Sequence, residues 1–313
     1  MSQLSSGSFF SHSIDSSSII DFLMISYSVK VSGSVEFPLE GTCDSRKGGE
    51  RKLVFSTLEH FLQIPQITES LVLIDEIPKI EDQGTNQFCQ LNDPKAAFIK
   101  VLNWLVSTVG VDAHQHGFNT NKNIAESASI DATAIIQSGV EIGAGSMIGA
   151  GAIIKTGTRI GENTIIRENT VIGSDGITVY RTLEDWLVKF PHVGGVSIGD
   201  NTEIGANAVI AGGILEATHI GSNVIVGNLC NIGHGATVED SVWISVGSLV
   251  GGHTKIGLGA TIAMGVTIRD NLVIGEQASL GMGSVVVKDV ESKYSMFGNP
   301  AKRMIGLKTG PKR

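Results

Sequence analysis

The stretch VGNLCNIGHGATVEDSVWISVGSLVGGHTKI, residues 226–256, carries an aliphatic residue at every sixth position. These positions are Val226, Ile232, Val238, Ile244, Val250 and Ile256. Neither an α-helix, with its period of 3.6, nor a β-strand, with its period of 2, explains a fixed step of six. A chain that turns a corner after each short strand explains it, because each side of a prism then points one aliphatic side chain to the axis.

The same spacing covers most of the C-terminal two thirds of the chain. It runs from Ile130 to Ile172, from Ile198 to Ile210 and from Ile220 to Val286. Gly, Asn and Asp follow the aliphatic positions, and these residues tolerate the positive φ of tight corners. The pattern is the hexapeptide-repeat signature of a parallel β-helix. We therefore predict a mainly β protein built on such a helix.

Two interruptions of the spacing and the composition of the remaining chain define the expected domains. Neither the step from Ile172 to Ile198 nor the step from Ile210 to Ile220 is a multiple of six. We predict a flexible N-terminus (1–15), a small α/β domain (16–110), a linker (111–123), the β-helix (124–290) with a loop excursion at 173–195, and a short C-terminal tail (291–313). Pro300 in that tail is expected to stop the strand ladder and protect its open edge.

The N-terminal region mixes short apolar runs with one clear helix signal. SIIDFLMISYSVKVSGSVEF (18–37) and KLVFSTLEHF (52–61) contain β-like runs, and LVLIDEI (71–77) predicts a buried strand. Asp93-Pro94 precedes KAAFIKVLNWLVSTV, and Pro suits the first turn of a helix. An α/β arrangement is expected here.

Composition excludes several classes of protein. The net charge of −8 and the lack of a basic run argue against nucleic-acid binding. No apolar stretch reaches the roughly 20 residues of a membrane span, and the N-terminus lacks the positive start of a secretory signal. The cysteines, Cys43, Cys89 and Cys230, are scattered without metal-ligand spacing and predict free thiols in the cytoplasm. We expect no bound metal or cofactor.

The strongest chemical candidate is a histidine in the repeats. Three six-residue sides make one coil, so His234 should lie directly below Gly252, three repeats later in the chain. A neutral imidazole can act as a general base, and a free backbone N–H can stabilise an oxyanion, which together suit acyl transfer. The alternative is a surface histidine on a turn. His253 is a second candidate, either as a substrate ligand or as a bystander.

Other candidates lie in the excursion and in the tail. The excursion contains Tyr180 and Trp186, aromatic residues in an aromatic-poor chain, and is either a functional loop or padding for a subunit contact. Lys302 and Arg303 either bind the phosphates of an acyl carrier or form a solvated basic tail.

Three segments carry a resemblance to a known family. NTVIGSDGITVY (169–180), DWLVKFPHVGGVSIGDNTEIGAN (185–207) and GNLCNIGHGATV (227–238) resemble the UDP-3-O-acylglucosamine N-acyltransferases of lipid A assembly. The resemblance implies a left-handed β-helix, although crossovers in sheets are usually right-handed. It also implies a homotrimer with active sites between neighbouring prisms, an acyl thioester as donor and a UDP-linked amino sugar as acceptor.

The resemblance also implies roles for individual residues. It assigns the general base to His234 and the oxyanion N–H to Gly252, and it places Asp175 and Asn228 at the substrate. A uracil-binding domain would correspond to residues 16–105, with Phe55 stacking on the base, although core packing explains Phe55 equally well.

Departures from the family pattern leave the donor and the activity open. Ala211 and Gly212 replace an Asp-Arg pair, Gly227 replaces an acidic residue, and Asn271 replaces a second histidine. The ending FGNPAK (297–302) instead resembles coenzyme A-dependent hexapeptide acetyltransferases. The alternatives are therefore an acetyl-coenzyme A-dependent O- or N-acetyltransferase, a structural trimer without activity and, remotely, a zinc-dependent enzyme like the hexapeptide carbonic anhydrases.

Overall fold

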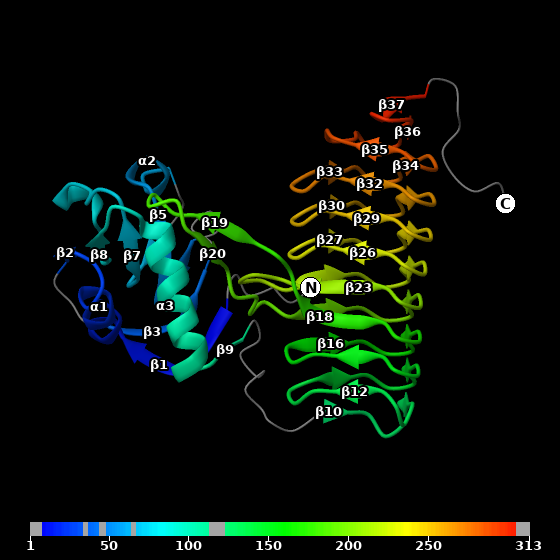
Figure 1. Ribbon diagram of the computed structural model, residues 1–313, viewed down its shortest axis with the longest axis horizontal. Helices are drawn as coiled ribbons and strands as arrows, with labels where there is room; N and C mark the ends of the chain where they lie inside the picture. Colours follow the sequence, from blue (N-terminus) through cyan, green and yellow to red (C-terminus); the bar gives the residue numbers. More distant parts are fainter. Residues whose placement is uncertain (1–7, 34–36, 44–47, 64–66, 113–122, 305–313) are drawn as a thin grey trace. The chain divides into compact units, whose positions relative to one another are not determined.

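A computed structural model describes residues 8–33, 37–43, 48–63, 67–112 and 123–304 of the chain. The chain divides into two compact units. The N-terminal unit comprises residues 1–118 together with 177–193, and the prism comprises residues 119–176 and 194–313 (Figure 1). The excursion predicted at 173–195 thus belongs largely to the N-terminal unit.

The N-terminal unit is built on a seven-stranded mixed sheet with the order β2-β8-β7-β5-β3-β1-β9, and β4 and β6 form a separate pair. The strands are β1 (Ser8–Asp15), β2 (Lys30–Ser32), β3 (Pro38–Thr42), β4 (Gly49–Glu50), β5 (Lys52–Ser56), β6 (Ile67–Thr68), β7 (Leu71–Ile74), β8 (Gln87–Gln90) and β9 (Val111–Asp112). The helices are α1 (Ser16–Met24), α2 (Leu58–Phe61), the 3-10 turn η2 (Ile80–Asp82) and α3 (Pro94–Thr108).

Helix α3 is the main cover of this sheet. Asp93 caps its N-terminus by accepting a hydrogen bond from the N–H of Ala96, and Pro94 occupies the first turn, as the sequence predicts. The helix packs on β5 and β7, and its face toward the sheet buries Phe98 and Leu102 completely. All four residues of β7 are buried, which confirms the strand predicted in LVLIDEI.

The structure differs from three predictions for the N-terminal region. Residues 8–15 form β1, which pairs with β3 and β9, so the chain is not loose from Ser8 onward. The predicted linker likewise begins with a strand, β9, and its residues 113–122 lie outside the described part of the chain. The start of the β-like run at 18–37 is helical, because Ile19, Ile20 and Leu23 bury one face of α1.

The prism consists of three parallel sheets. The first contains β10 (Asn123–Ile124), β13 (Glu141–Ile142), β16 (Thr158–Ile160), β21 (Val196–Ile198), β24 (Thr218–Ile220), β27 (Thr237–Val238), β30 (Lys255–Ile256) and β33 (Val273–Ile274). The second contains β11 (Ser129–Ile130), β14 (Met147–Ile148), β17 (Ile165–Ile166), β22 (Glu203–Ile204), β25 (Ile225–Val226), β28 (Trp243–Ile244), β31 (Thr261–Ile262), β34 (Ser279–Leu280), β36 (Ser295–Phe297) and β37 (Lys302–Arg303). The third contains β12 (Ile135–Ile136), β15 (Ile153–Ile154), β18 (Val171–Asp175), β23 (Val209–Gly212), β26 (Asn231–Ile232), β29 (Leu249–Val250), β32 (Thr267–Ile268) and β35 (Val285–Val286).

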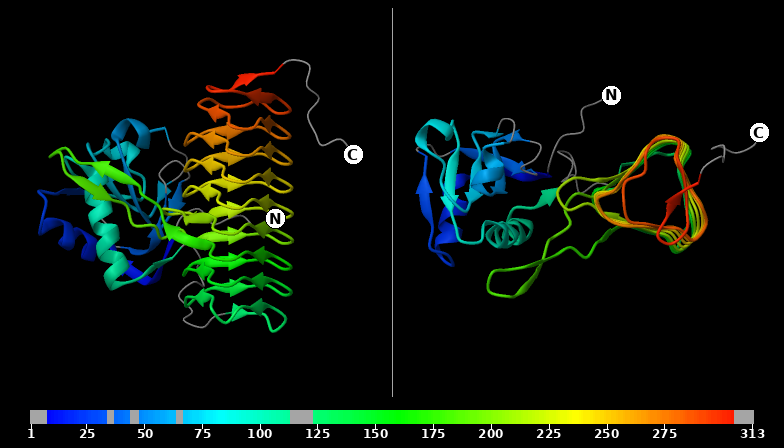
Figure 2. Two further views of the ribbon diagram at one scale, coloured as in Figure 1. Left: turned by 45° about the vertical axis from the view of Figure 1, so that its right-hand side comes forward. Right: turned by 90° about the horizontal axis from the view of Figure 1, so that it is seen from above.

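The coils of the prism stack in the register that the six-residue spacing predicts. Ile232 pairs with Val250 and Val250 with Ile268, so each partner lies three repeats further along the chain. Seen from above, the stacked coils have a three-sided outline (Figure 2). The parallel β-helix is therefore confirmed, while its left-handed sense stays a prediction from the resemblance.

A second inward position, which the spacing argument missed, completes the prism core. It lies two places before each aliphatic position and carries a small residue, such as Ser146, Thr164, Thr202 or Val224, each at most 1% exposed. Hydroxyls in this column bind backbone at the corners. The Thr164 hydroxyl donates to the carbonyl of Gly199 at 2.8 Å and accepts from the N–H of Thr202 at 3.2 Å. A buried hydroxyl such as this one is tolerated because its hydrogen bonds are satisfied.

The excursion forms a β-hairpin. Its strands are β19 (Val179–Arg181) and β20 (Leu187–Lys189), which pair antiparallel. Strands β18 and β23 are longer than the other strands of the third sheet, and they remain paired as far as Asp175 and Gly212. The prism therefore departs from the two-residue strand pattern at the point where the excursion begins.

The ladder of the second sheet continues beyond the predicted end of the β-helix at residue 290. Strand β36 pairs parallel with β34, and β37 then folds back antiparallel on β36. Pro300 lies between these two strands, in the turn that reverses the chain. The predicted C-terminal tail is thus partly a hairpin on the end of the prism.

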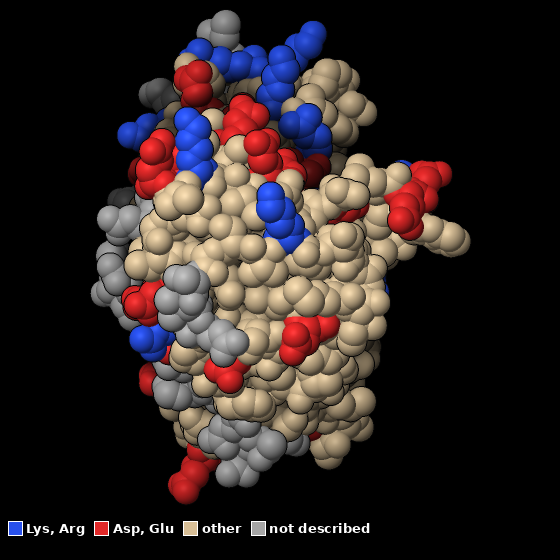
Figure 3. Space-filling view, turned by 90° about the vertical axis from the view of Figure 1, so that its left-hand side faces the viewer, with Lys and Arg blue, Asp and Glu red and all other residues tan. Residues whose placement is uncertain are grey.

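Acidic and basic side chains are interspersed on the face drawn in Figure 3, and uncharged residues cover much of it. In the described parts of the chain, no helix is long and apolar enough to cross a membrane.

Candidate functional site

Two stacked turns bring the candidate residues together. One turn follows β26 and contains Gly233, His234 and Gly235, and the next follows β29 and contains Gly251, Gly252 and His253. Strands β26 and β29 are directly paired, and the N–H of His253 donates to the carbonyl of His234 at 2.9 Å. We call these six residues the histidine corner; it joins the third sheet to the first.

The imidazole of His234 occupies space that only a glycine leaves open. A Cβ atom at position 252 would lie 2.6 Å from Cε1 and 2.7 Å from Nε2 of His234. Real Cβ contacts are not this short, so an alanine there would displace the ring. The predicted stacking of His234 below Gly252 is confirmed.

The N–H of Gly252 differs from its neighbours. The N–H groups of Gly251 and His253 donate to the carbonyls of Ile268 and His234, whereas no acceptor is found for the N–H of Gly252 among the described residues. At some other corners the corresponding N–H donates to a side chain of an adjacent coil, as Ala206 does to Oδ1 of Asn228 at 2.8 Å. An N–H without an acceptor in the protein is able to donate to an incoming oxyanion.

His253 is arranged reciprocally to His234 in the histidine corner. Its ring and that of His234 meet edge to face with centroids 4.9 Å apart. A Cβ atom at Gly235 would lie 2.6 Å from Nδ1 of His253, so each histidine faces a glycine of the other turn. His253 is exposed and has a φ of 55°, a conformation that Gly and Asn adopt more readily.

The charge state of His234 is set by its surroundings. Burial, followed by the nearby His253, lowers the pKa of His234, while Asp270 acts in the opposite direction. The imidazole is therefore neutral at pH 7 and able to accept a proton. Sequence reasoning missed Asp270, although it lies one full coil after Gly252 and hence in the same column.

The column below His234 is not continued by the residue that an unbroken six-residue period would place there. Because Ile210 pairs with Ile232, the step at this level is longer than three repeats. Gly212, not Glu216, therefore continues the column of His234, and Glu216 lies in the connection to β24. Glu216, 18 residues before His234, would share that column only if the spacing were unbroken, so its pairing with His234 does not follow from the register.

Asp175 lies one coil below Gly212 in the prism. It pairs with Gly212 in the β18–β23 ladder, and its carboxylate contacts Nζ of Lys155 at 3.5 Å. Both side chains are partly exposed, so the pair contributes little stability. Lys155 is a polar group near the predicted substrate ligand that sequence reasoning did not identify.

Tyr180 and Trp186 differ in their surroundings. The Tyr180 hydroxyl donates to Oδ1 of Asp93 at 3.0 Å, and Nζ of Lys95 lies 4.8 Å from its ring centroid. Asp93 also accepts the N–H of Leu183, so it ties the hairpin to the start of α3. Trp186, in contrast, is 70% exposed. Of the two aromatic residues, Trp186 is therefore the one whose side chain is available to a ligand.

The other predicted residues lie apart from the histidine corner. Phe55, on β5, packs against Phe98 of α3 with ring centroids 4.9 Å apart, as core packing predicts. Asn228 follows the second sheet and therefore lies at another corner of its own prism. Lys302 and Arg303 form β37, and the Arg303 guanidinium lies 3.6 Å from the centroid of the Tyr294 ring.

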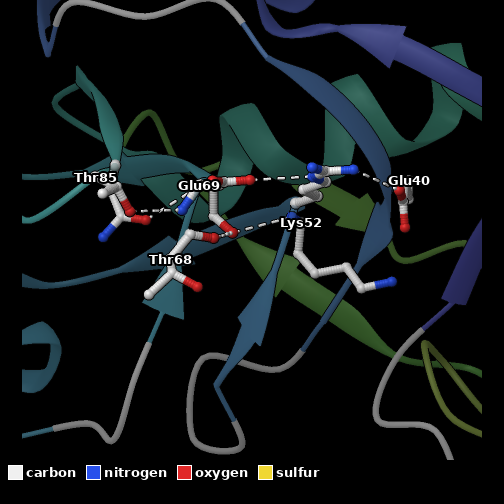
Figure 4. A network of polar contacts seen from close by, with 8 residues as sticks. Glu40, Lys52, Thr68, Glu69 and Thr85 are labelled. Carbon is white, nitrogen blue, oxygen red and sulfur yellow. Dashed lines mark hydrogen bonds and ion pairs between the residues drawn. The ribbon is translucent and has the colours of Figure 1, made fainter.

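A polar network in the N-terminal unit is structural. Arg51 bridges Glu40 and Glu69 at 3.3 and 3.1 Å, and the N–H of Glu69 donates to the Thr85 hydroxyl (Figure 4). These ion pairs are half exposed, which limits their contribution to stability. In Figure 4 the Lys52 side chain points away from them, and burial lowers its pKa.

No metal centre is apparent in the described residues, since no three His, Cys, Asp or Glu side chains gather closely enough to hold an ion. The free cysteines, Cys43, Cys89 and Cys230, are all buried. Burial raises the pKa of the Cys89 thiol to about 12, which makes it unreactive.

Comparisons with known proteins agree with this architecture. The family model described as the hexapeptide repeat of succinyl-transferase matches residues 139–177 and 195–228. A curated UDP-3-O-acylglucosamine N-acyltransferase of Shewanella denitrificans is 44% identical over 77 residues, which are 25% of this chain and 22% of that protein. The same enzyme of Pseudoalteromonas translucida is 42% identical over 73 residues, or 23% of this chain and 21% of that protein.

The chain thus matches about a fifth of the length of these curated relatives. A crystal structure of UDP-N-acetylglucosamine O-acyltransferase from Moraxella catarrhalis is also similar, with a TM-score of 0.40 and 27% identity over 58% of this chain and 74% of that chain. The resemblance stated from the sequence is confirmed over the matched stretch.

Proposed function

We propose that this relative of the UDP-3-O-acylglucosamine N-acyltransferases transfers an acyl group from a thioester to the amino group of a UDP-linked amino sugar, in the cytoplasm, during lipid A or surface-polysaccharide assembly. The observation that carries the proposal is the imidazole of His234 against Gly252, whose N–H has no acceptor among the described residues. A neutral base beside such an N–H is what acyl transfer to an amine requires.

The reaction needs only groups of the histidine corner and its two substrates. The sugar nitrogen attacks the thioester carbon while the neutral imidazole of His234 accepts the proton of the amine. The N–H of Gly252 donates to the oxyanion of the tetrahedral intermediate. The carbon–sulfur bond then breaks, the imidazolium returns the proton to the thiolate, and the products are an amide and a free thiol. The protein supplies no cofactor in this scheme.

We assign the supporting roles by their chemistry. Asp175 with Lys155, and the exposed Trp186, supply polar and aromatic contacts to the sugar or the acyl chain. The N-terminal unit binds the uridine nucleotide, with Phe55 the candidate to stack on the base. In a homotrimer a neighbouring chain would bring its Asn228 corner to the histidine corner.

Two kinds of acyl donor fit this reaction. An acyl carrier protein and coenzyme A both present a phosphopantetheine thioester, and the FGNPAK ending, which forms the β36–β37 hairpin, favours coenzyme A as the second candidate. Assays with acyl carrier protein thioesters, acetyl-coenzyme A and longer acyl-coenzyme A, each with UDP-amino sugars, separate the two. An inactive structural trimer would turn over none of them.

Replacement of His234 tests the mechanism. We expect His234→Ala to lower kcat by roughly 10²- to 10⁴-fold, the usual contribution of a general base, while the assembly and the melting temperature stay close to those of the parent. His219→Asn is the control, because His219 lies on β24 in the first sheet. Full activity in His234→Ala would remove the mechanism.

A further inference from the structure

The two turns of the histidine corner are built around each other. His234-Gly235 lies below Gly252-His253, so that each imidazole faces a glycine in the adjacent coil. A Cβ atom at either glycine would come within 2.6 Å of the facing ring. The arrangement constrains two histidine rings, although the proposed reaction uses one.

His253 occupies its place against the preference of its backbone. Its φ of 55° falls in the left-handed region, which Gly or Asn fills at many other corners, as at Gly235 and Asn271. A residue with a Cβ atom is disfavoured there, because the Cβ comes too close to a backbone carbonyl oxygen. Backbone strain of this kind is often found where a side chain serves a site.

The contact between the two rings indicates what His253 does. The centroids are 4.9 Å apart and the planes meet at 79°, so the edge of one ring lies against the face of the other. Edge-to-face contact is a favoured arrangement of aromatic rings, so it restrains the orientation of both imidazoles. His253 is exposed while His234 is half-buried, so His253 is the outer of the two rings.

We propose that His253 is a positioning residue, whose ring holds the imidazole of His234 in the space left by Gly252 and keeps it ready to accept a proton. The inference rests on the proposed function, in which His234 is the base. His253 contacts the His234 ring, and Asp270 acts on it from two coils above. The column one coil lower contributes uncharged Gly212, while the buried Oε1 of Glu216 lies in the connection that leads from there to β24. Two imidazoles this close disfavour each other's positive charge, and Asp270 opposes that effect.

His253→Asn is the decisive variant, because Asn suits a positive φ and the fold should be kept. Titration of the His234 ring by NMR in the free protein needs no substrate. We expect the pKa of His234 to rise in this variant, because the neighbouring imidazole is gone. Gln277→Asn is the matched control, since Gln277 has a φ of 54° at an exposed corner; there the titration of His234 should not move.

Kinetics provide the second measurement. We expect His253→Asn to lower kcat by roughly 10- to 100-fold, since a misplaced catalytic group can cost about 10² in rate, with KM nearly unchanged and the acid limb shifted to higher pH. An unchanged titration of His234, or an unchanged kcat, would overturn the inference. If the titration shifts but His234→Ala remains active, the ring contact stands and the proposed function falls.

Discussion

Gly252 and Gly235 decide what the histidine corner can do. A methyl group at either position would lie 2.6 Å from the facing imidazole. The site therefore depends on the lack of a side chain at the two glycines as much as on the two histidine rings. The conformational freedom of glycine is a secondary matter at Gly252, whose φ is not positive. What matters there is the close approach of the ring to the backbone.

Gly252→Ala should therefore impair catalysis more than it impairs folding. The methyl group would displace the His234 ring, and we expect kcat to fall by about 10²-fold, the cost of a misplaced base. Gly212→Ala in the same column is the comparison, because its methyl group would lie 3.5 Å from the nearest atom. Steady-state rates and melting temperatures of both variants check this; equal losses would contradict it.

The pH dependence follows from the lowered pKa of His234. Burial and His253 keep the ring neutral, so kcat/KM should stay level near pH 7 and fall only as the pH drops below the ordinary histidine value of about 6.5. In the unfolded chain the ring takes up its proton first as the pH falls, so stability should also decrease below that value. Rate profiles and urea unfolding at several pH values measure both effects; an acid limb above pH 7 would contradict the assignment.

Simple spacing predicts a good part of this site and misses the rest for definable reasons. A step of three repeats places His234 below Gly252, and the same step would have identified Asp270. The coil below is different, because Ile210 and Ile232 are paired although they are more than three repeats apart. Only this register shows that Gly212, and not Glu216, continues the column of His234. The ring contact of His253 depends on its φ, which the sequence does not reveal.

Among the elements, the β19–β20 hairpin is tied to α3 through one carboxylate. Asp93 accepts hydrogen bonds from the N–H of Ala96, the hydroxyl of Tyr180 and the N–H of Leu183. The same residue thus starts a helix and fastens a segment that lies far later in the chain. Residue composition alone could not predict this connection.

Asp93→Ala should destabilise the N-terminal unit by roughly 2–4 kcal/mol, because it removes a helix cap and two charge-assisted hydrogen bonds. Tyr180→Phe removes only one of these bonds and should cost about 1–2 kcal/mol. Urea unfolding gives the two free energies, and limited proteolysis reports on the hairpin. Equal effects of the two variants would show that Asp93 does not connect the elements.

The elements of the prism were easier to predict than those of the N-terminal unit. The aliphatic column from Ile142 to Val286 has one interpretation, because only a triangular coil buries every sixth residue. The run at 18–37 was ambiguous, since Ile19, Ile20 and Leu23 suit a strand as well as one face of a helix. The inward small residues, such as Thr164, carry the same spacing as the isoleucines but were hidden by their polarity.

For the whole molecule, one edge of the prism differs from the others in composition. Exposed apolar side chains gather at the corner between the second and third sheets and on the strands beside it. They are Ile225, Leu229, Trp243, Val246, Leu249, Met264 and Met282. The first sheet presents mostly polar residues outward, including Glu141, Arg159 and Lys255, with Val273 as an exposed apolar exception. Exposed apolar patches of this kind mark interaction surfaces.

The proposed trimer can be tested at this edge. We expect Trp243→Glu to shift the assembly toward monomers and to lower activity, because a charge would have to be buried in the interface. Lys255→Glu on the polar face should leave the assembly unchanged. Analytical ultracentrifugation measures the mass of each variant; a trimer that survives Trp243→Glu would place the interface elsewhere.

The antiparallel return of β37 has a consequence for the length of the molecule. Each coil presents backbone hydrogen-bonding groups to the next coil. The repeat sequence itself therefore does not limit the number of coils. In the second sheet, β37 meets the last parallel strand in the opposite direction, and a further coil, from this chain or from another copy, cannot dock there in register. The repeat alone would allow a β-helix of any length, and the two-residue strand β37 ends the ladder of its second sheet.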